Sequence, residues 1–165
     1  MKLVTDTREQ EPLSFSAVEG VELVRECLPV GDYGAWYGDV QVKAVVERKS
    51  IGDLFTSFTS NYEAERAKMV RARDAGLRFI LAIEAPLTEI RKGHSYWKNG
   101  QTHQSKKGGL AQIRQLLTCS LKYGIEVQYF QSRSEMAWWI QEYFLSWGKI
   151  INGPTKDTDG GSSSL

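Results

Sequence analysis

Residues Val40 to Leu54, VQVKAVVERKSIGDL, carry the clearest fold signal in the sequence. The first ten of them, Val40–Lys49, are rich in valine, which predicts a β-strand buried on both faces for much of its length. A helix is expected to begin at Ser50, because Ser50 and Asp53 have the S-x-x-D spacing of a capping box. A strand followed at once by a helix is the unit from which α/β domains are built.

Outside this stretch, short apolar runs alternate with helical patterns. Further strands are expected over residues 2–5, 21–28, 35–37, 78–85 and 125–130. Helices are expected over residues 61–75, 87–92, 110–123 and 135–151. Because the early strands follow one another through short turns, the expected fold class is α/β, with a mixed β-sheet flanked by helices.

The division of the chain follows from its composition. Residues 1–151 are expected to form one domain, and the Gly/Ser-rich residues 152–165 a disordered tail. The polar residues 93–109 are expected to form a long loop. In the helix that follows, the core-facing stripe is predicted to consist of Leu110, Ile113, Leu117 and Leu121.

The overall composition excludes several classes of protein. The 165 residues are 41% hydrophobic and 25% charged, which is globular rather than disordered or fibrous usage. No apolar run approaches the ~20 residues that cross a bilayer, and the N-terminus lacks the layout of a signal peptide. Two cysteines are too few for a disulfide scaffold. We therefore expect a cytoplasmic protein (nuclear in a eukaryote) with no membrane partner.

The net charge of +1 hides an asymmetry. No Asp or Glu occurs from Arg91 to Ile125, whereas seven Lys and Arg residues do: Arg91, Lys92, Lys98, Lys106, Lys107, Arg114 and Lys122. Such a block predicts one surface that meets a polyanion. The alternative is a solvated loop and helix face.

Charged residues at the end of the long strand suggest a site. Strand alternation places Glu47 and Lys49 on one face and Arg48 on the other. Asp32 lies in a Gly-Asp turn whose hairpin leads back to this strand, so Asp32 and Glu47 can converge. Two carboxylates without His or Cys nearby suit a hard cation such as Mg²⁺ or Mn²⁺. Taken singly, these residues also fit a turn and an incidental ion pair at a strand end.

Further charges follow the first strand. Asp6, Arg8 and Glu9 lie where that strand ends, and ligand sites gather at strand ends in open α/β sheets. A polar exit loop is the structural alternative. Asp53 is explained by its capping role alone.

Three segments together resemble a known family. VTDTREQEPL, LPVGDYG and VVERKSIGDL are similar to the XPF-family nuclease domain, a member of the restriction-endonuclease-like PD-(D/E)xK group. The family signature, Gly-Asp followed by Glu-Arg-Lys, three residues and Asp, matches Gly31-Asp32, Glu47-Arg48-Lys49 and Asp53. The upstream Asp-x-Arg-Glu of the family matches Asp6, Arg8 and Glu9.

The resemblance implies a divalent-metal-dependent DNA endonuclease, structure-selective, acting in DNA repair, recombination or phage-type DNA processing. By the family pattern, Asp32, Glu47 and the main-chain carbonyl of Arg48 hold Mg²⁺ or Mn²⁺. Lys49 steadies the attacking water or the transition-state charge. Asp6 and Glu9 complete the acidic pocket, and Arg8 contacts DNA.

Two departures from the family pattern matter. Helix-hairpin-helix repeats usually follow the nuclease domain, whereas only the Gly/Ser-rich tail follows Ile151 here, which leaves room for a separate DNA-targeting partner. An Arg near the start of the second helix is replaced by Asn61-Tyr62. Arg66 and Arg73, seven residues apart, are candidates to replace its DNA contact, although a solvated face is the alternative.

The expected loop is both basic and aromatic. It combines His94, Tyr96, Trp97 and His103 with lysines that include Lys106 and Lys107. Lysines bind phosphates and aromatic rings stack on unpaired bases, so this loop is a candidate DNA contact.

The last helix is apolar on two sides. One stripe, expected to dock on the sheet, consists of Met136, Ile140, Tyr143, Trp147 and Ile150. Trp138 and Leu145 lie opposite, and Leu116, Cys119 and Tyr123 are expected to form a similar outer stripe on the preceding helix. These stripes predict a homodimer through the last two helices. A helix wedged between the sheet and a neighbour would hide both sides instead.

A function from a different class also fits a chain of this kind. It is a non-catalytic DNA- or partner-binding module that retains the nuclease fold. The joint presence of Asp32, Glu47 and Lys49 favours the enzyme, because a degenerate copy has no chemical need for all three.

Overall fold

A computed structural model describes residues 1–151 and 153 and contains a seven-stranded mixed sheet. Its strands are β1 (Lys2–Asp6), β2 (Glu22–Glu26), β3 (Tyr33–Tyr37), β4 (Val40–Gln41), β5 (Ala44–Ser50), β6 (Arg78–Glu84) and β9 (Glu126–Tyr129). The order is β2-β1-β3-β5-β6-β9, with β4 beside β3. The β1–β2, β5–β6 and β6–β9 pairs are parallel, and β3 runs antiparallel to both β1 and β5. The predicted mixed sheet is confirmed.

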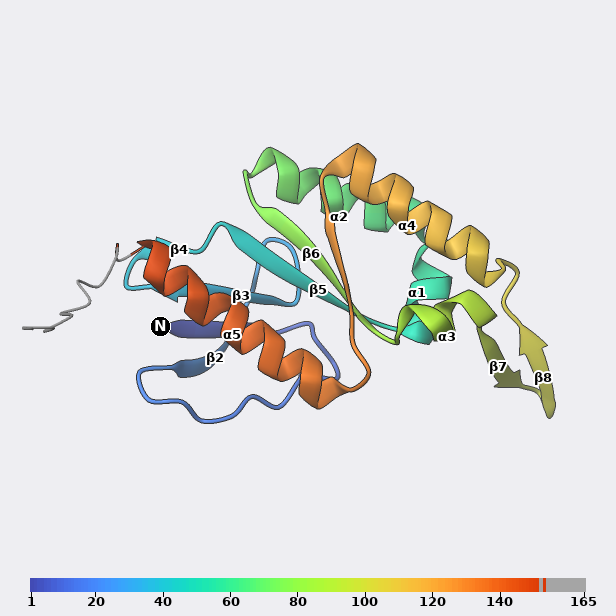
Figure 1. The fold of residues 1–165 in the computed structure, drawn as a ribbon, viewed down its shortest axis with the longest axis horizontal. Helices are drawn as coiled ribbons and strands as arrows, with labels where there is room; N and C mark the ends of the chain where they lie inside the picture. The colour runs from blue at the N-terminus through green and yellow to red at the C-terminus, as the bar shows by residue number, and fades with distance from the viewer. Residues whose placement is uncertain (152, 154–165) are drawn as a thin grey trace, which may run out of the picture.

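Helices cover both faces of this sheet (Figure 1). They are α1 (Ile51–Ser57), α2 (Tyr62–Asp74), α3 (Leu87–Lys92), α4 (Gly109–Tyr123) and α5 (Arg133–Ile151). One hydrophobic cluster joins the sheet to α1, α2, α3 and α4, and a second joins its other face to α5. The α/β prediction is therefore confirmed, with helices on both faces.

Strand β5 lies inside the sheet between β3 and β6. Val45 belongs to the cluster under α1, α2 and α4, whereas Val46 belongs to the cluster under α5. Alternation then directs Glu47 and Lys49 to the first side and Arg48 to the second, as predicted. The predicted strand Val40–Lys49 is divided into β4 and β5, both of which pair with β3.

The start of α1 confirms the capping box. The Ser50 hydroxyl accepts a hydrogen bond from the Asp53 amide at 3.1 Å and donates one to the Asp53 carboxylate at 2.7 Å. These bonds satisfy a backbone donor that the first helical turn leaves unpaired. Asp53 thus has a structural role.

The predicted orientation of α4 is wrong. Leu116, Cys119 and Tyr123, expected on the outer face, are buried, whereas Leu117 and Leu121 are 57% and 90% exposed. The cause lies at Gly109, where a Cβ would lie 2.1 Å from the Ile90 carbonyl oxygen. Only glycine permits this approach to α3, so the helix must turn the Gly109 side inward, and Leu116 follows two turns later.

The prediction of a loop over residues 93–109 is also wrong, because the middle of this segment forms two strands. Residues Ser95–Lys98 (β7) and Gln101–Gln104 (β8) form an antiparallel hairpin that projects from one end of the molecule (Figure 1). Asn99 and Gly100 connect the strands at φ of 51° and 76°. An Asn-Gly pair with positive φ is the turn that matches the twist of a two-residue hairpin, and this signal was missed among the polar residues.

Helix α5 docks largely as predicted. Met136 and Ile140 are fully buried with Phe144, whereas Trp138 is 63% exposed and Ile150 is 69% exposed. The predicted tail, 152–165, lies outside the described residues apart from Gly153. Among the residues that the structure describes, no helix combines the length and apolar character needed to cross a membrane.

The rotation of α4 gives a stability test. Leu116→Ala should lower the free energy of unfolding by about 2–5 kcal/mol, because it leaves a cavity in the core. Leu117→Ala, one residue along the same helix, should change it by less than about 0.5 kcal/mol in a monomeric sample, where the outer face of α4 is exposed to water. Urea unfolding of both variants measures the difference, and equal costs would contradict the orientation of α4.

Candidate functional site

Backbone hydrogen bonds hold Asp32 between two strands. Its amide donates to the Val46 carbonyl at 2.8 Å, and its carbonyl accepts from the Asp6 amide at 2.7 Å. The preceding Gly31 has φ of 82°, and a Cβ there would lie 3.0 Å from the Val45 Cβ. Glycine is therefore required at this turn, which brings the Asp32 side chain to β5.

The Asp32 carboxylate carries an uncompensated charge. It accepts a hydrogen bond from the Arg48 amide at 2.8 Å, but within residues 1–151 and 153 it has no ion-pair partner. Burial and the nearby Glu47 carboxylate together raise the pKa of Asp32 to about 7. Two carboxyl groups in this arrangement favour either a shared proton or a bound cation.

The Glu47 side chain lies in a network of alternating charges. It accepts hydrogen bonds from the ammonium groups of Lys49 at 2.8 Å and Lys68 at 2.5 Å. The Lys49 ammonium also donates to Glu65 on α2 at 2.9 Å. Burial alone would lower the pKa of Lys49, but Glu47 and Glu65 outweigh it and raise that pKa. Lys49 is therefore a fixed positive charge beside the two carboxylates.

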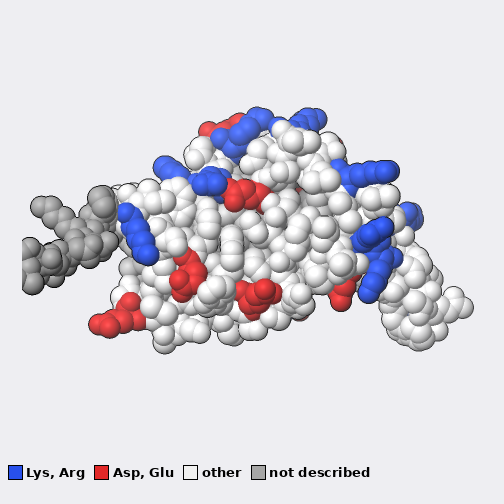
Figure 2. Space-filling model, viewed as in Figure 1, with Lys and Arg blue, Asp and Glu red and all other residues white. Residues whose placement is uncertain are grey.

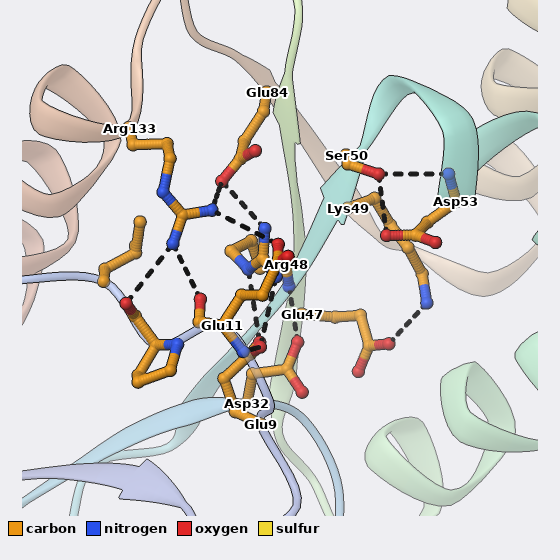
Figure 3. A network of polar contacts seen from close by, with 12 residues as sticks. Glu9, Glu11, Asp32, Glu47, Arg48, Lys49, Ser50, Asp53, Glu84 and Arg133 are labelled. Atoms are coloured by element: carbon orange, nitrogen blue, oxygen red, sulfur yellow. Dashed lines mark hydrogen bonds and ion pairs between the residues drawn. The ribbon is translucent and has the colours of Figure 1, made fainter. Parts of the chain in front are cut away.

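Arg48 points to the other side of β5 (Figure 3). Its guanidinium donates to Glu9 at 3.1 Å and to Glu84 at 2.8 Å, and Arg133 donates to the same Glu84 at 2.7 Å. Glu9, expected in the acidic pocket, is thus turned to Arg48. The network joins the segment after β1 to β6 and the start of α5.

Asp6 is held by other partners. Arg8 donates to its two carboxylate oxygens at 2.7 and 2.9 Å, and the Leu28 amide donates at 2.6 Å. Burial would raise the pKa of Asp6, but the bonds from Arg8 and Leu28 outweigh it and lower that pKa. Asp6 therefore lies beside Asp32 with its oxygens already engaged.

A cavity of about 280 Å³ opens over these groups. Its charged lining consists of Asp6, Arg8, Asp32, Glu47, Lys68 and Arg71. Three of these residues are basic and surround the carboxylates. The cavity therefore suits an anionic group placed next to a cation.

The donor atoms fit a hard divalent cation. Asp32 and Glu47 offer carboxylate oxygens, and the main chain at Arg48 adjoins both of them. Among the described residues, no group of three or more His, Cys, Asp or Glu side chains is placed to hold a metal ion. A cation here would rely on two carboxylates, the main chain and water, as Mg²⁺ sites commonly do.

The predicted DNA contacts lie in several places. On the surface of α2, Arg66 pairs with Glu63 at 3.1 Å and Arg73 with Asp74 at 2.9 Å. The Lys107 ammonium donates to the Phe58 carbonyl and the Gln115 side chain. Lys106 lines a different cavity, beside α1.

Three residues of α2 that were not predicted from the sequence also reach the site, namely Glu65, Lys68 and Arg71. Glu65 and Lys68 are three residues apart and Arg71 follows one turn later, so they share a helix face. This spacing was the available signal, but such pairs are common on solvated helices. What sets this one apart is that its face packs over the end of β5.

The surface charge is uneven (Figure 2). On the face shown, Lys and Arg lie along the upper edge and at both sides, and those at the right lie over α3 and α4. Most of the Asp and Glu on this face lie over its lower half. This agrees with a basic block that contains no acid between Arg91 and Ile125.

Comparisons with known proteins place the chain in a family. The sequence model of the ERCC4 domain family matches residues 5–143. No curated protein matches the chain. The solved structure of XPF from Aeropyrum pernix is similar, with a TM-score of 0.61 at 19% identity over 92% of this chain and 68% of that one. XPF from Aeropyrum pernix in complex with DNA has a TM-score of 0.62 at 19% identity, over 90% of this chain and 66% of that one.

These similarities confirm the expected XPF-like nuclease fold. About a third of each solved chain has no counterpart here. The family match covers all three sequence motifs except the residues before Thr5. The chain therefore belongs to the ERCC4 domain family.

Proposed function

We propose that the chain is a divalent-metal-dependent endodeoxyribonuclease. One observation carries this proposal: two converging carboxylates, Asp32 and Glu47, line a cavity with a basic rim, and Glu47 accepts a hydrogen bond from the fixed ammonium of Lys49. Hydrolysis of a phosphodiester needs a positioned water, a Lewis acid, and positive charge where the transition state becomes more negative. This cavity offers a place for each.

Each residue has a distinct role in this proposal. Asp32, Glu47 and the carbonyl of Arg48 would hold Mg²⁺ or Mn²⁺, which supplies the Lewis acid and lowers the pKa of water. Lys49 stabilises the negative charge that develops on the phosphate. Glu65 positions Lys49 through their hydrogen bond of 2.9 Å.

The basic rim suggests how the substrate is held. Lys68 and Arg71 on α2, with Arg8 after β1, are placed to bind phosphates on either side of the bond that is cut. Asp6 and Arg48 act as positioning residues, Asp6 by fixing the Arg8 guanidinium and Arg48 by fixing Glu9.

DNA is the proposed substrate because of the family, the basic surface and the DNA complex of a structural relative. We propose structure-selective cleavage in DNA repair, recombination or phage-type processing, with a separate partner for DNA targeting. A non-catalytic binding module is the second candidate. It is disfavoured by the buried charges of Asp32, Glu47 and Lys49, which cost stability without serving binding.

Cleavage assays test the catalytic roles. Asp32→Asn and Glu47→Gln should each remove nearly all Mg²⁺-dependent cleavage of flap, fork, duplex and single-stranded DNA, because each change deletes an anionic oxygen but keeps the shape. Lys49→Ala should lower the cleavage rate by about 10²–10³-fold. Glu63→Gln, on the exposed side of α2, is the matched control and should cleave like the parent. A Glu47→Gln variant that cuts at the parental rate would contradict the assignment.

The pKa of Asp32 gives a test without metal. Because that pKa is raised from an ordinary 3.8 to about 7, the folded protein binds this proton more tightly than the unfolded chain. In EDTA, the free energy of unfolding of the parent should therefore fall, relative to Asp32→Asn, as the pH rises from about 4 through 7. Urea unfolding across this range measures the difference, which would stay constant if Asp32 had an ordinary pKa.

We also propose that two copies of the chain pair through α4. Leu110, Leu117 and Leu121, which were predicted to face the core, lie instead on the outer face of α4, with exposed fractions of 52%, 57% and 90%. A face of this kind marks an interface more often than a free surface. The predicted joint surface with Trp138 is less favoured, because α4 and α5 cover opposite faces of the sheet (Figure 1).

Light scattering behind a sizing column tests the pairing. The parent should run as a dimer at tens of micromolar, and Leu117→Glu combined with Leu121→Glu should run as a folded monomer, because charges replace the buried contact. Trp138→Glu is the matched change on α5 and should remain dimeric. A monomeric parent, or a dimer lost through Trp138→Glu alone, would contradict the α4 interface.

A further inference from the structure

Two basic residues of α2 line the cavity over Asp32, and they differ in what holds them. The Lys68 ammonium donates to Oε1 of Glu47 at 2.5 Å, and Oε1 of Glu65 lies 3.4 Å from it. Arg71, three residues later, makes no ion pair with any residue that the structure describes. Lys68 is therefore engaged by a carboxylate of the candidate metal site, whereas Arg71 is open to a ligand.

Lys49 and Lys68 share both carboxylate partners but are held differently. Lys49 donates to Glu47 at 2.8 Å and to Glu65 at 2.9 Å, so both of its bonds are short. Its side chain is 9% exposed and does not line the cavity, whereas that of Lys68 is 30% exposed and does. Of the two ammonium groups, only that of Lys68 can leave Glu47 without becoming a buried, unpaired charge.

Each of the two candidate metal-binding carboxylates keeps one oxygen without a partner. Both ammonium groups bind Oε1 of Glu47, and the Arg48 amide binds Oδ2 of Asp32. Within residues 1–151 and 153, Oε2 of Glu47 and Oδ1 of Asp32 accept no hydrogen bond. Carboxylate oxygens are the ligands that Mg²⁺ prefers. A dication bound there would share the Glu47 carboxylate with Lys68.

The net charge of this cluster changes sign when a dication binds. Asp32, Glu47 and Glu65 carry three negative charges when ionised, against the two positive charges of Lys49 and Lys68. A divalent ion turns this excess of one negative charge into an excess of one positive charge. It also repels an ammonium group on the same carboxylate. Lys68, the more exposed of the two lysines, is the one free to move to an anion in the cavity.

We propose that Lys68 couples metal binding to DNA binding, because its ammonium group pairs with Glu47 in the metal-free protein and with a DNA phosphate in the metal-bound protein. The inference rests on the proposed nuclease function and specifies how its two ligands cooperate. The coupling is reciprocal, since a phosphate that draws Lys68 away from Glu47 removes a competitor of the metal.

A Mn²⁺ titration without DNA tests the first half of the coupling, with EPR spectroscopy measuring the free ion. Lys68→Met should bind Mn²⁺ about tenfold more tightly than the parent, because the ammonium group that competes for Glu47 is gone. Methionine keeps the helix propensity of lysine, and Glu47 keeps Lys49 as its partner, so the variant should fold. Arg71→Met is the matched control. It removes one exposed, screened charge that has no contact with Glu47, and should change the Mn²⁺ Kd less than about twofold.

DNA binding tests the second half. Anisotropy of a fluorescent fork oligonucleotide gives the Kd in EDTA and in Ca²⁺, which also takes oxygen ligands, and a gel confirms that the probe stays intact. Lys68→Met should keep the parental Kd in EDTA and weaken binding about tenfold in Ca²⁺. Arg71→Met should weaken binding in both conditions, because its guanidinium group is open to phosphate with or without the metal.

Three results would overturn the coupling. An equal loss of DNA affinity by Lys68→Met in EDTA and in Ca²⁺ would make Lys68 a permanent phosphate contact. No loss in either condition would leave the ion pair of Lys68 with Glu47 a structural one only. A Mn²⁺ Kd of Lys68→Met that equals or exceeds that of the parent would show that Lys68 does not compete with the metal.

The failure of this coupling is distinguishable from the failure of the proposed function. If the parent binds both Mn²⁺ and DNA and Lys68→Met behaves like it, the coupling alone is overturned. If the parent takes up no Mn²⁺, or binds no DNA in either condition, the metal-dependent nuclease function is overturned along with it.

Discussion

The alternation of side chains along β5 places three charged residues in the interior, and each needs a partner there. Glu47, Arg48 and Lys49 are all less than a tenth exposed. An unpaired charge at such depth is strongly destabilising. Two ion-pair networks, one on each face of the strand, supply these partners. Arg48 joins Glu9 and Glu84 on the α5 side, and Lys49 joins Glu47 to Glu65 on the α2 side.

The two networks have different roles. The Arg48 network is neutralised and ties the segment after β1 to β6 and α5, so its contribution is to position the elements. On the other face, Asp32 adds a carboxylate that has no cation of its own among the described residues. Because of this excess negative charge, this side of the strand fits a divalent cation. The basic residues of α2 lie beside it and are placed to bind phosphates.

The periphery is set by close packing. Gly109 lets α4 touch the backbone of α3, and this contact fixes which helix face is left exposed. The hairpin leaves the same corner of the molecule, and His94 before it stacks on Phe55 of α1. The proposed interface at the leucines of α4 therefore depends on how this corner packs.

The fold class, the burial of β5, the opposite directions of Glu47 and Arg48 and the capping role of Asp53 could all be predicted from the sequence, because each depends on local spacing along one element. The approach of Asp32 to Glu47 through a short hairpin could be predicted as well. The sequence did not predict that Glu9 turns to Arg48, that Lys68 and Arg71 reach the site, or that α4 buries Leu116 rather than Leu117. These outcomes depend on contacts between different elements of the fold. On α4, for example, two apolar stripes could each face the core, and the close backbone contact of Gly109 with Ile90 determines which of them is buried.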